Sequence, residues 1–386
     1  MRVLLLTSST GGGHDMRARS FVRWTHMQGA PPIEAEVFQT LESGPTLYRF
    51  GVHLYNWIQR HCPALHHVYF NALEVLGLHE HASGLEGTAP FEAKLREFRP
   101  QVIVSTHAHL NHGYFAKARR ILHGQVRCTT YCGELHGGYG FSRFWVNPAA
   151  DYFAGAVSET CDEAARLNMP PEKTMRAGFL LNPKFWEAPE TDLERNTFVR
   201  EELKLDPEQF ILVLGTGANS ANNHLKLLDA LKHSELRPQI VALCGRSEAA
   251  FNAVRSWARA QDAFAVRALP YCDRMPELLR AASALIARPG TGTTSEAILC
   301  GCPLIFNGIG GVMPQERITL EFARARGFGR RLKRPSQLPG LLRPLMQGDA
   351  RLRSERVALQ AARSAEHPLD FLRMVHELGQ SVSTKQ

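Results

Sequence analysis

Short runs of apolar residues alternate with longer segments of helical periodicity through most of the chain. The runs are RVLLLT from residue 2, QVIVS from 101, FILVLG from 210, QIVALC from 239, ALIA from 284 and PLIFN from 303. The first is followed by a glycine-rich turn, and the next four by amphipathic segments. Strands that are apolar on both faces and joined by helical crossovers predict parallel sheets covered on both sides.

This strand-and-helix unit occurs twice, before about residue 180 and after about residue 205. Residues 186–204 carry prolines, charges and little periodicity, so we interpret them as a linker. A chain of 386 residues is also long enough for two domains. We therefore expect an α/β protein with an N-terminal domain over 1–185 and a C-terminal domain over 205–386, two doubly wound, Rossmann-like units that face each other across a cleft. The last helix is expected to cross back to the first domain.

Composition narrows the class of protein. Hydrophobic residues make up 44% and charged residues 21%, which excludes disordered and collagen-like chains. No apolar run approaches the ~18 residues of a membrane span. The first run lacks a cleavage site, so we interpret it as a strand and not a signal peptide. The 8 cysteines form no framework, as expected for reduced thiols in the cytoplasm. A net charge of +8 favours an anionic partner.

Residues 41–81 depart from this pattern because they are rich in aromatic residues and poor in charge. Apolar side chains recur there at helical spacing, with Tyr55 close by, and these are Leu47, Phe50, Leu54, Trp57 and Ile58. One interpretation is an insertion helix packed on its own domain. The other is a helix whose apolar face enters a membrane interface, where Trp and Tyr are favoured. Both can hold, since one end can pack while the other contacts lipid.

The first candidate for chemistry is TSSTGGGH, residues 7–14, directly after the first strand. Gly12 and Gly13 let the backbone turn tightly and approach a ligand, and the following helix start offers N–H groups. His14 then lies at the carboxyl edge of a parallel sheet, where ligands bind. A neutral imidazole there can take a proton from an attacking hydroxyl. Asp15 is the rival base, or a residue that orients the entry to the helix.

Two further loops follow strands of the second half. Gly215, Thr216 and Gly217 make a tight turn, either an ordinary strand-to-helix loop or a set of backbone donors for a phosphate. The more specific loop supplies small residues, hydroxyls and a helix N-terminus, and its members are Gly290, Thr291, Gly292, Thr293 and Thr294. That combination can hold a diphosphate without a metal.

Three carboxylate or amide side chains accompany these loops. Glu296 is expected in the first turn of the helix, where it either partners the helix dipole or accepts hydrogen bonds from a ribose diol. Gln315 and Glu316 follow a second glycine-rich stretch, GIGGVMP, and are candidates for reading the hydroxyls of a sugar.

Taken together, GGGH, RPGTGTTSEAILCGCPLI from Arg288 and PQE from Pro314 resemble the processive diacylglycerol glycosyltransferases and monogalactosyldiacylglycerol synthases. The wider group includes the peptidoglycan lipid-intermediate glycosyltransferase. The resemblance is ordered along most of the chain. It implies a GT-B fold and an enzyme that moves a hexose, with inversion and without a metal or cofactor, from a UDP-sugar to a lipid hydroxyl, that of diacylglycerol.

The resemblance also implies roles for individual residues. His14 matches the base, Glu296 the ribose-binding carboxylate, and the loop from Gly290 to Thr294 the diphosphate site. The remaining substrate-binding positions are the turn residues Gly12 and Gly13, the second loop's Gly215 and Gly217, Met275 beside the uracil, and the sugar-recognition pair Gln315 and Glu316. Residues 41–81 correspond to the acceptor-binding region that contacts the membrane, so the enzyme is expected to be cytoplasmic and peripheral on the inner face of the membrane.

Three positions differ from the family pattern. Thr319 stands where the family commonly has Asn, Asn147 replaces a histidine, and TTYCGEL places Glu134 near the family's aspartate in a VTD-like run. These positions lie nearest to the acceptor and the sugar ring.

Two other functions are also compatible with parts of this sequence. A non-hydrolysing UDP-sugar epimerase shares the architecture, but the aromatic 41–81 stretch argues against it, and a non-catalytic sugar-nucleotide- or lipid-binding protein is the other alternative.

Cys128, Cys132 and His136 lack the usual zinc spacing, so we expect no metal. Three histidines, His107, His109 and His112, follow a strand and are expected to contact the acceptor. The basic run from Arg324 favours an anionic membrane surface and, without interleaved aromatic residues, no nucleic acid.

Overall fold

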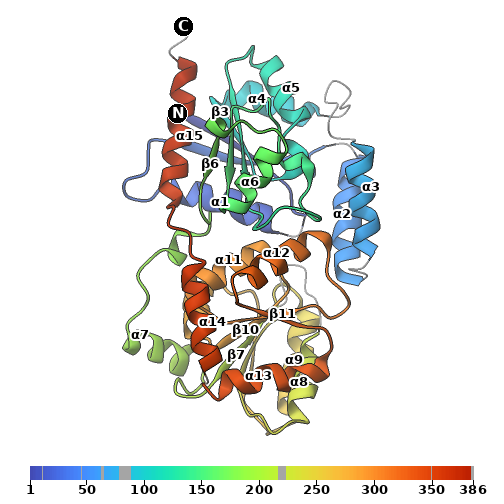
Figure 1. Ribbon diagram of the computed structural model, residues 1–386, viewed down its shortest axis with the longest axis vertical. Coiled ribbons are helices and arrows are strands. Elements are labelled where there is room, and N and C mark those ends of the chain that lie inside the picture. Colours follow the sequence, from blue (N-terminus) through green and yellow to red (C-terminus); the bar gives the residue numbers. More distant parts are fainter. Residues whose placement is uncertain are drawn as a thin grey trace. The chain divides into compact units, whose positions relative to one another are not determined.

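A computed structural model describes residues 1–10, 12–44, 46–61, 65–77, 88–215, 223–348 and 350–383 (Figure 1). The chain divides into two compact units. Unit 1 consists of residues 1–183, 313–318 and 364–386, and unit 2 of residues 184–312 and 319–363.

Unit 1 is built on a parallel sheet of 6 strands in the order β2-β1-β3-β4-β5-β6. The strands are β1 (Arg2–Thr7), β2 (Glu34–Gln39), β3 (Val102–Ser105), β4 (Arg127–Cys132), β5 (Tyr152–Gly155) and β6 (Thr174–Arg176). Residues Val3 to Leu6 of β1 are fully buried and pair with Val102 to Ser105 of β3. An apolar strand buried on both faces needs helices above and below it, as the sequence pattern predicts.

The helices that accompany this sheet follow from the amphipathic segments. They are α1 (Gly13–Trp24), α4 (Ala89–Phe98), α5 (Gly113–Ile121), α6 (Ser158–Arg166) and the last helix, α15 (Pro368–Ser383). Helix α15 packs against α1, β3 and β4, so it belongs to unit 1 (Figure 1). Phe371 anchors it, with its ring 5.8 Å from the ring of Phe21 and 5.4 Å from that of Tyr131.

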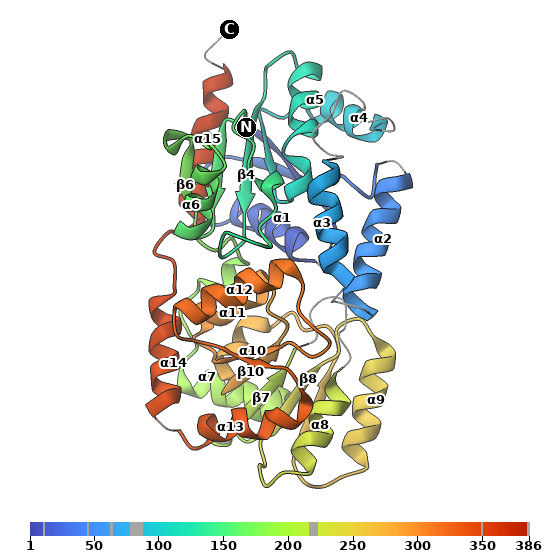
Figure 2. The ribbon, with the colours of Figure 1, turned by 45° about the vertical axis from the view of Figure 1, so that its right-hand side comes forward.

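Helices α2 (Thr46–His61) and α3 (His66–Leu76) lie side by side within the segment that is rich in aromatic residues (Figure 2). The helix predicted there is confirmed. Val52 and Ile58 of α2 are buried, whereas Phe50 and Trp57, which are seven residues apart and so share a face of the helix, are more than half exposed. The segment therefore packs through one face and presents an apolar face to its surroundings.

Unit 2 repeats the plan, with a parallel sheet in the order β12-β11-β10-β7-β8-β9. Its strands are β7 (Ile211–Leu214), β8 (Gln239–Leu243), β9 (Val266–Leu269), β10 (Ala284–Ala287), β11 (Leu304–Asn307) and β12 (Arg330–Leu332). Its helices are α7 (Asp192–Thr197), α8 (His224–Lys232), α9 (Glu248–Arg259), α10 (Met275–Ala281), α11 (Thr291–Cys300), α13 (Leu338–Met346) and α14 (Ala350–Ala361). Helix α12 (Pro314–Ala325) begins with residues of unit 1 and continues in unit 2.

The segment interpreted as a linker, residues 186–204, contains regular structure. Helix α7 continues into a π-helical turn, Phe198–Glu202, in which Phe198 and Val199 are buried. Among the described helices, none combines the length and the apolar character that crossing a membrane requires.

Candidate active site

The strand order locates the ligand-binding edge of each sheet. In unit 1, β1 lies between β2 and β3, and in unit 2, β7 lies between β8 and β10. In open parallel sheets, ligands bind beyond the carboxyl ends of the strands at such switch points. The turn with His14 follows β1 and Thr106 follows β3, while Gly215 follows β7 and the loop at Gly290 follows β10. The sequence-predicted loops thus lie at the switch point of their own sheet.

The turn after β1 needs glycine at one position. Gly12 has a φ of 80°, in the left-handed region, and precedes the first residue of α1. Only glycine adopts this conformation without strain. The turn directs the second residue of the helix, His14, toward the end of β3, where its Nδ1 lies 2.7 Å from the Thr106 carbonyl oxygen.

This hydrogen bond determines the tautomer of His14. A carbonyl oxygen can only accept, so Nδ1 carries the hydrogen and Nε2 has the lone pair. Burial and the nearby Arg17 guanidinium lower the pKa of His14 to about 4, although the Thr106 carbonyl and Asp15 act in the opposite direction. At neutral pH the imidazole is therefore uncharged, with Nε2 able to accept a proton.

His107 supports the ring of His14. Its Nδ1 accepts the backbone N–H of His109 at 3.2 Å, so its Nε2 carries the hydrogen and donates to the Thr10 hydroxyl at 2.9 Å. The two imidazole rings are 4.5 Å apart in an edge-to-face arrangement, and the ring of Trp145 is 5.7 Å from that of His14. The position of the His14 ring is thus fixed by groups from the segments that follow β3 and β4.

The other two histidines of this cluster are further along the same segment. The rings of His109 and His112 lie 5.5 and 6.0 Å from that of Phe144. Within the ranges that the structure describes, no group of three His, Cys, Asp or Glu side chains is arranged to hold a metal ion.

Asp15, the rival base, organises the turn. Its carboxylate accepts hydrogen bonds from the hydroxyls of Thr7 (3.2 Å) and Ser9 (2.9 Å) and from the amide of Gln39 (2.7 Å). These three hydrogen bonds hold the carboxylate against β1, the turn after it and β2. Its position therefore favours the interpretation as an orienting residue.

In unit 2, the loop after β10 leads directly into α11. Gly290 precedes the helix with a φ of −80°, and a Cβ placed on it would meet nothing within 4 Å. Neither the backbone conformation nor internal packing requires glycine there, which leaves open space for a ligand to approach the backbone. The first turn, with Thr291, Gly292 and Thr293, presents the N–H groups of a helix start, and the buried Thr294 hydroxyl has no hydrogen-bond partner among the described residues.

One expectation about this helix is wrong. Glu296 is the sixth residue of α11, and the first turn contains no acidic residue. Because the effect of the helix dipole on a side chain falls off within the first turn, Glu296 does not gain from it as predicted. Its side chain is partly exposed, on the second turn of the helix.

The remaining predicted residues of unit 2 are near the same edge. The Gly215 N–H donates to the Ile286 carbonyl at 2.7 Å, which ties the end of β7 to β10. Met275 begins α10 and is partly buried. Thr216 and Gly217 lie outside the described residues.

Gln315 and Glu316 belong to unit 1, at the start of α12. The Gln315 amide donates to the Tyr55 hydroxyl of α2 at 2.8 Å. The Glu316 carboxylate is 3% exposed and accepts the Met313 backbone N–H at 2.8 Å. Glu316 thus stabilises the start of its own helix, and Gln315 links that start to α2.

Comparison with known proteins agrees with this geometry. Residues 210–307 match the glycosyltransferase family 28 C-terminal domain. A probable chloroplastic monogalactosyldiacylglycerol synthase of Nicotiana tabacum is 24% identical over 99% of this chain and 71% of its own length. The processive diacylglycerol beta-glucosyltransferase of Bacillus subtilis is 23% identical over 84% of this chain and 82% of its own. The chain is a distant relative of these family 28 glycolipid synthases.

Solved structures place the chain in the GT-B fold class. Acinetobacter baumannii MurG superimposes with a TM-score of 0.58 at 16% identity, covering 97% of this chain and 99% of MurG. Anabaena Alr3699/HepE, solved in complex with UDP, gives 0.57 at 13% identity over all of both chains. The two parallel six-stranded sheets are those of this fold, so the predicted fold class and family are confirmed.

The sequence pattern assigns no role to Arg17, whose buried guanidinium lies beside the residue that precedes Glu134. Arg17 of α1 is 4% exposed and donates to the Gly133 carbonyl at 2.8 Å, and any Cβ on Gly133 would overlap its guanidinium. Glu134, the next residue, is 7% exposed. Glu134 stands two residues after the end of β4, and its burial is notable because charged residues are rarely buried without a partner.

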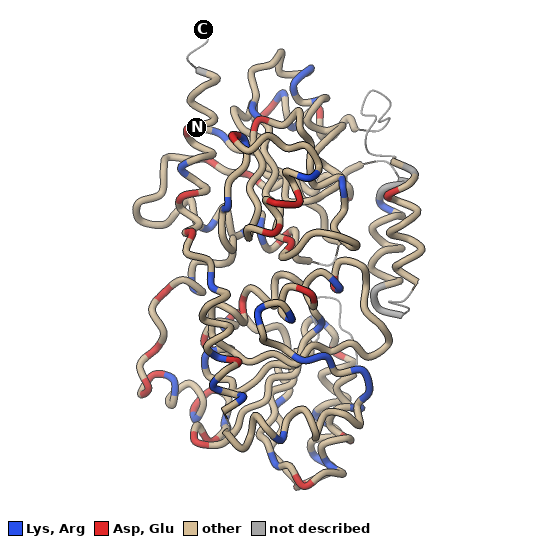
Figure 3. Tube along the Cα trace, in the orientation of Figure 1, with Lys and Arg blue, Asp and Glu red and all other residues tan. Residues whose placement is uncertain are grey.

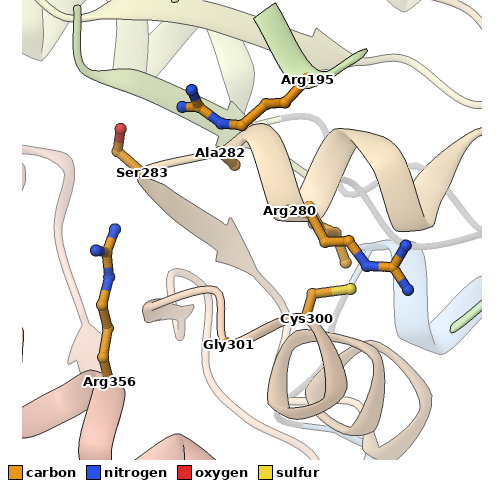
Figure 4. Close-up of a pocket in the computed structure, with 8 residues that line it drawn as sticks. Arg195, Arg280, Ala282, Ser283, Cys300, Gly301 and Arg356 are labelled. Carbon is orange, nitrogen blue, oxygen red and sulfur yellow. The ribbon is translucent and has the colours of Figure 1, made fainter. Parts of the chain in front are cut away.

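Unit 2 also has a cavity of about 370 Å³ away from these loops. It is lined by Arg195, Arg280, Ser283, Cys300 and Arg356, among others (Figure 4). Ser283 precedes β10 and Cys300 ends α11, so the cavity lies at the amino end of the strand and the far end of the helix from the Gly290 loop. Arg280 is paired there with Glu190 at 2.9 Å. This cavity is therefore distinct from the predicted diphosphate loop.

Proposed function

We propose that the chain is an inverting, metal-independent hexosyltransferase that moves a hexose from a UDP-sugar to a lipid hydroxyl, with diacylglycerol as the acceptor. The observation that carries the proposal is the neutral His14 imidazole, whose Nδ1 is bonded to the Thr106 carbonyl and whose Nε2 is able to accept a proton. The names of the relatives support a diacylglycerol acceptor, and the UDP complex of the Anabaena protein supports the nucleotide.

In the proposed reaction, the acceptor oxygen attacks the anomeric carbon of the hexose. The new C–O bond forms as the bond from that carbon to the diphosphate oxygen breaks, and UDP leaves with the bonding electrons. The hydroxyl proton passes to Nε2 of His14, and the Thr106 carbonyl favours the resulting imidazolium. A weakly basic imidazole suffices because the proton becomes acidic as the bond forms.

The leaving diphosphate is assigned to the start of α11. Backbone N–H groups and the hydroxyls of Thr291, Thr293 and Thr294 would stabilise the developing charge. Losing one such donor lowers the rate by roughly 10²–10³ in comparable oxyanion sites. Glu296 would accept hydrogen bonds from the ribose, Met275 would border the uracil, and Gly215 and Gly217 would contribute a second loop.

The lipid would be reached through helices α2 and α3, whose described residues include few that are charged (Figure 3). Phe50 and Trp57 of α2 are 60% and 51% exposed, and Val68 and Val75 of α3 are 66% and 82% exposed. Each pair is seven residues apart and therefore shares a helix face. An exposed apolar face with a tryptophan suits a membrane interface. The basic run from Arg324 to Arg334 would add attraction to anionic lipid on the cytoplasmic side.

Incubation of the purified protein with labelled UDP-glucose, UDP-galactose or UDP-N-acetylglucosamine and vesicles that contain diacylglycerol tests the proposal. We expect a labelled glycolipid from one donor, formed equally well in the presence of EDTA. Binding of UDP-sugar without any glycolipid would favour a non-catalytic binding protein. Conversion of one nucleotide sugar into another would favour an epimerase.

A further inference from the structure

The cavity of unit 2 that lies at the amino end of β10 has a strongly basic lining. Its charged side chains are Arg195 of α7, Arg280 of α10 and Arg356 of α14, and none of the described residues that line it is acidic. Its volume of about 370 Å³ is within the range of sites for small ligands. Like charges around one cavity repel one another unless carboxylates or a bound anion compensate them.

One of the three arginines is compensated by the protein itself. The Arg280 guanidinium is 2.9 Å from the Glu190 carboxylate and donates to the carbonyl oxygens of Lys184 and Glu187 at 3.1 Å. In the close-up it points away from Ser283 (Figure 4). Arg280 therefore holds the segment before α7 against α10, and its charge is already paired.

The other two arginines have no carboxylate partner. Arg356 forms no hydrogen bond or ion pair with any described residue. Arg195 donates only to neutral groups there, the side-chain oxygen of Asn196 at 3.1 Å and the Ala281 carbonyl at 3.4 Å. Both guanidinium groups are directed toward Ser283, from different sides of the cavity (Figure 4). Two uncompensated positive charges thus converge on one residue.

Ser283 adds a hydroxyl at the point where they converge. Its backbone N–H donates to the Ile211 carbonyl at 2.8 Å, and its Oγ accepts the Ile211 N–H at 3.1 Å. These two bonds fix the serine at the amino end of β10. Its hydroxyl hydrogen is donated to none of the described residues, so it is available to an acceptor in the cavity.

The ends of neighbouring helices do not account for these arginines. Helices α10 and α11 both end beside the cavity, and cations stabilise a helix C-terminus. The contact of Arg195 with the Ala281 carbonyl is long, and Arg356 bonds no carbonyl. In α11, the Leu299 carbonyl instead accepts from Arg363. Most donors of Arg195 and Arg356 therefore remain unused.

We propose that Arg195, Arg356 and Ser283 form a binding site for a small, soluble, phosphate-bearing anion. The planar fork of a guanidinium matches two oxygens of a phosphate, and two such forks with a hydroxyl can bind all faces of a tetrahedral dianion that remain within the cavity. The apolar members of the lining, Leu279 and Ala282, are buried, so the cavity offers no exposed apolar surface to an acyl chain.

This site is separate from the proposed diphosphate loop. Ser283 precedes β10 and Arg288 follows it, and at about 3.3 Å per residue these two positions are roughly 16 Å apart. A phosphate held beside Ser283 is therefore beyond hydrogen-bond reach of the Gly290 loop. The site thus adds a second anion to the one that the proposed transfer reaction requires.

Calorimetric titration with sodium phosphate, against sodium chloride of equal ionic strength, tests the site. The double variant R195Q/R356Q removes the two unpaired charges. The control R200Q/R353Q removes two exposed charges from the π-helical turn after α7 and from α14, and neither residue lines the cavity. We expect wild type and the control to bind phosphate alike and R195Q/R356Q to bind it at least tenfold more weakly, with an unchanged unfolding temperature in chloride.

A second comparison separates this site from the donor site. Phosphate binding should persist in G290A and in the presence of saturating UDP. Equal phosphate binding by R195Q/R356Q and wild type, or no binding by wild type, would overturn the site, as would loss in G290A or displacement by UDP. Binding to phosphatidic acid vesicles but not to free phosphate would overturn its assignment to a soluble anion. Every readout is binding, so the result does not depend on whether a glycolipid is formed.

Discussion

The Nδ1 of His14 lies 2.7 Å from the carbonyl oxygen of Thr106, a residue 92 positions away in the sequence. The bond joins the turn after β1 to the end of β3, across the switch point of the first sheet. It fixes both the orientation of the imidazole and the nitrogen that carries the hydrogen. The proposed chemistry depends on this pairing, since only the unprotonated Nε2 can receive the acceptor's proton.

The tautomer and charge of His14 can be observed directly. In protein labelled with ¹⁵N-histidine, the His14 resonance, assigned by its loss in His14→Ala, should show a hydrogen on Nδ1 and titrate near pH 4. The reason is that burial and Arg17 both disfavour the imidazolium. A midpoint near the usual 6.5, or a hydrogen on Nε2, would contradict the assignment.

Two glycines offer a matched test of the diphosphate loop. Gly290→Ala should leave the unfolding temperature unchanged, because its φ is −80° and its surroundings are open, but should weaken UDP binding by about tenfold or more. Gly12→Ala, with a φ of 80°, should instead lower the stability by roughly 1–2 kcal/mol. Thermal unfolding and calorimetry measure both effects. Normal UDP binding by Gly290→Ala would remove this loop from the donor site.

Glu134 should make the stability of the protein depend on pH. Its folded pKa of about 7 lies above the usual 4.5, so the unfolded state ionises first as the pH rises. The free energy of unfolding should therefore fall between about pH 4.5 and 7, and the penalty should be about 3 kcal/mol above that range. Glu134→Gln removes this penalty. The free energy of unfolding of the variant should therefore equal that of wild type at pH 4.5 and exceed it at pH 8. Urea unfolding at several pH values would show this.

Glu172→Gln, an exposed substitution in the same unit, is the control for this experiment. A stability difference between Glu134→Gln and wild type that stays constant from pH 4.5 to 8 would mean that Glu134 is ionised normally.

The apolar face of α2 and α3 predicts binding to membranes. A Trp57→Glu, Val68→Glu double variant should lose at least tenfold in co-sedimentation with diacylglycerol-containing vesicles, because each exposed side chain contributes about 1.5–3 kcal/mol when it leaves water. Val357→Glu, at an equally exposed valine on α14, should bind as wild type does. Equal binding by the two variants would place the lipid contact elsewhere.

The sequence predicts the central strands well, because long apolar runs such as that from Val3 to Leu6 can be buried only inside a parallel sheet. The edge strands are not predicted. Strand β2, EAEVFQ, and the three-residue strand β12, RRL, are partly exposed and carry charges, so no apolar run marks them. Helix α7 is not predicted for the same reason, because its six residues include no buried apolar side chain to mark a helix within the segment interpreted as a linker.

For the site, glycine and histidine at a strand end indicate where chemistry is expected, but not which group performs it. Asp15 remained a rival base until Gln39, 24 residues later, was seen to donate to its carboxylate. The environment of Glu134 depends on Arg17, which contacts Gly133 from 116 residues earlier in the chain. Such roles arise from contacts between residues that are distant in the sequence. The spacing of neighbouring residues does not predict these contacts.

The most direct test of the account is glycolipid formation by His14→Ala. With saturating UDP-sugar and diacylglycerol vesicles, we expect the rate to fall by roughly 10²–10⁴ while the affinity for UDP stays within about twofold of wild type. His26→Ala, at an exposed histidine just after the same helix, should retain full activity. A His14→Ala enzyme that forms glycolipid at the wild-type rate would contradict the central claim that this imidazole takes the acceptor's proton.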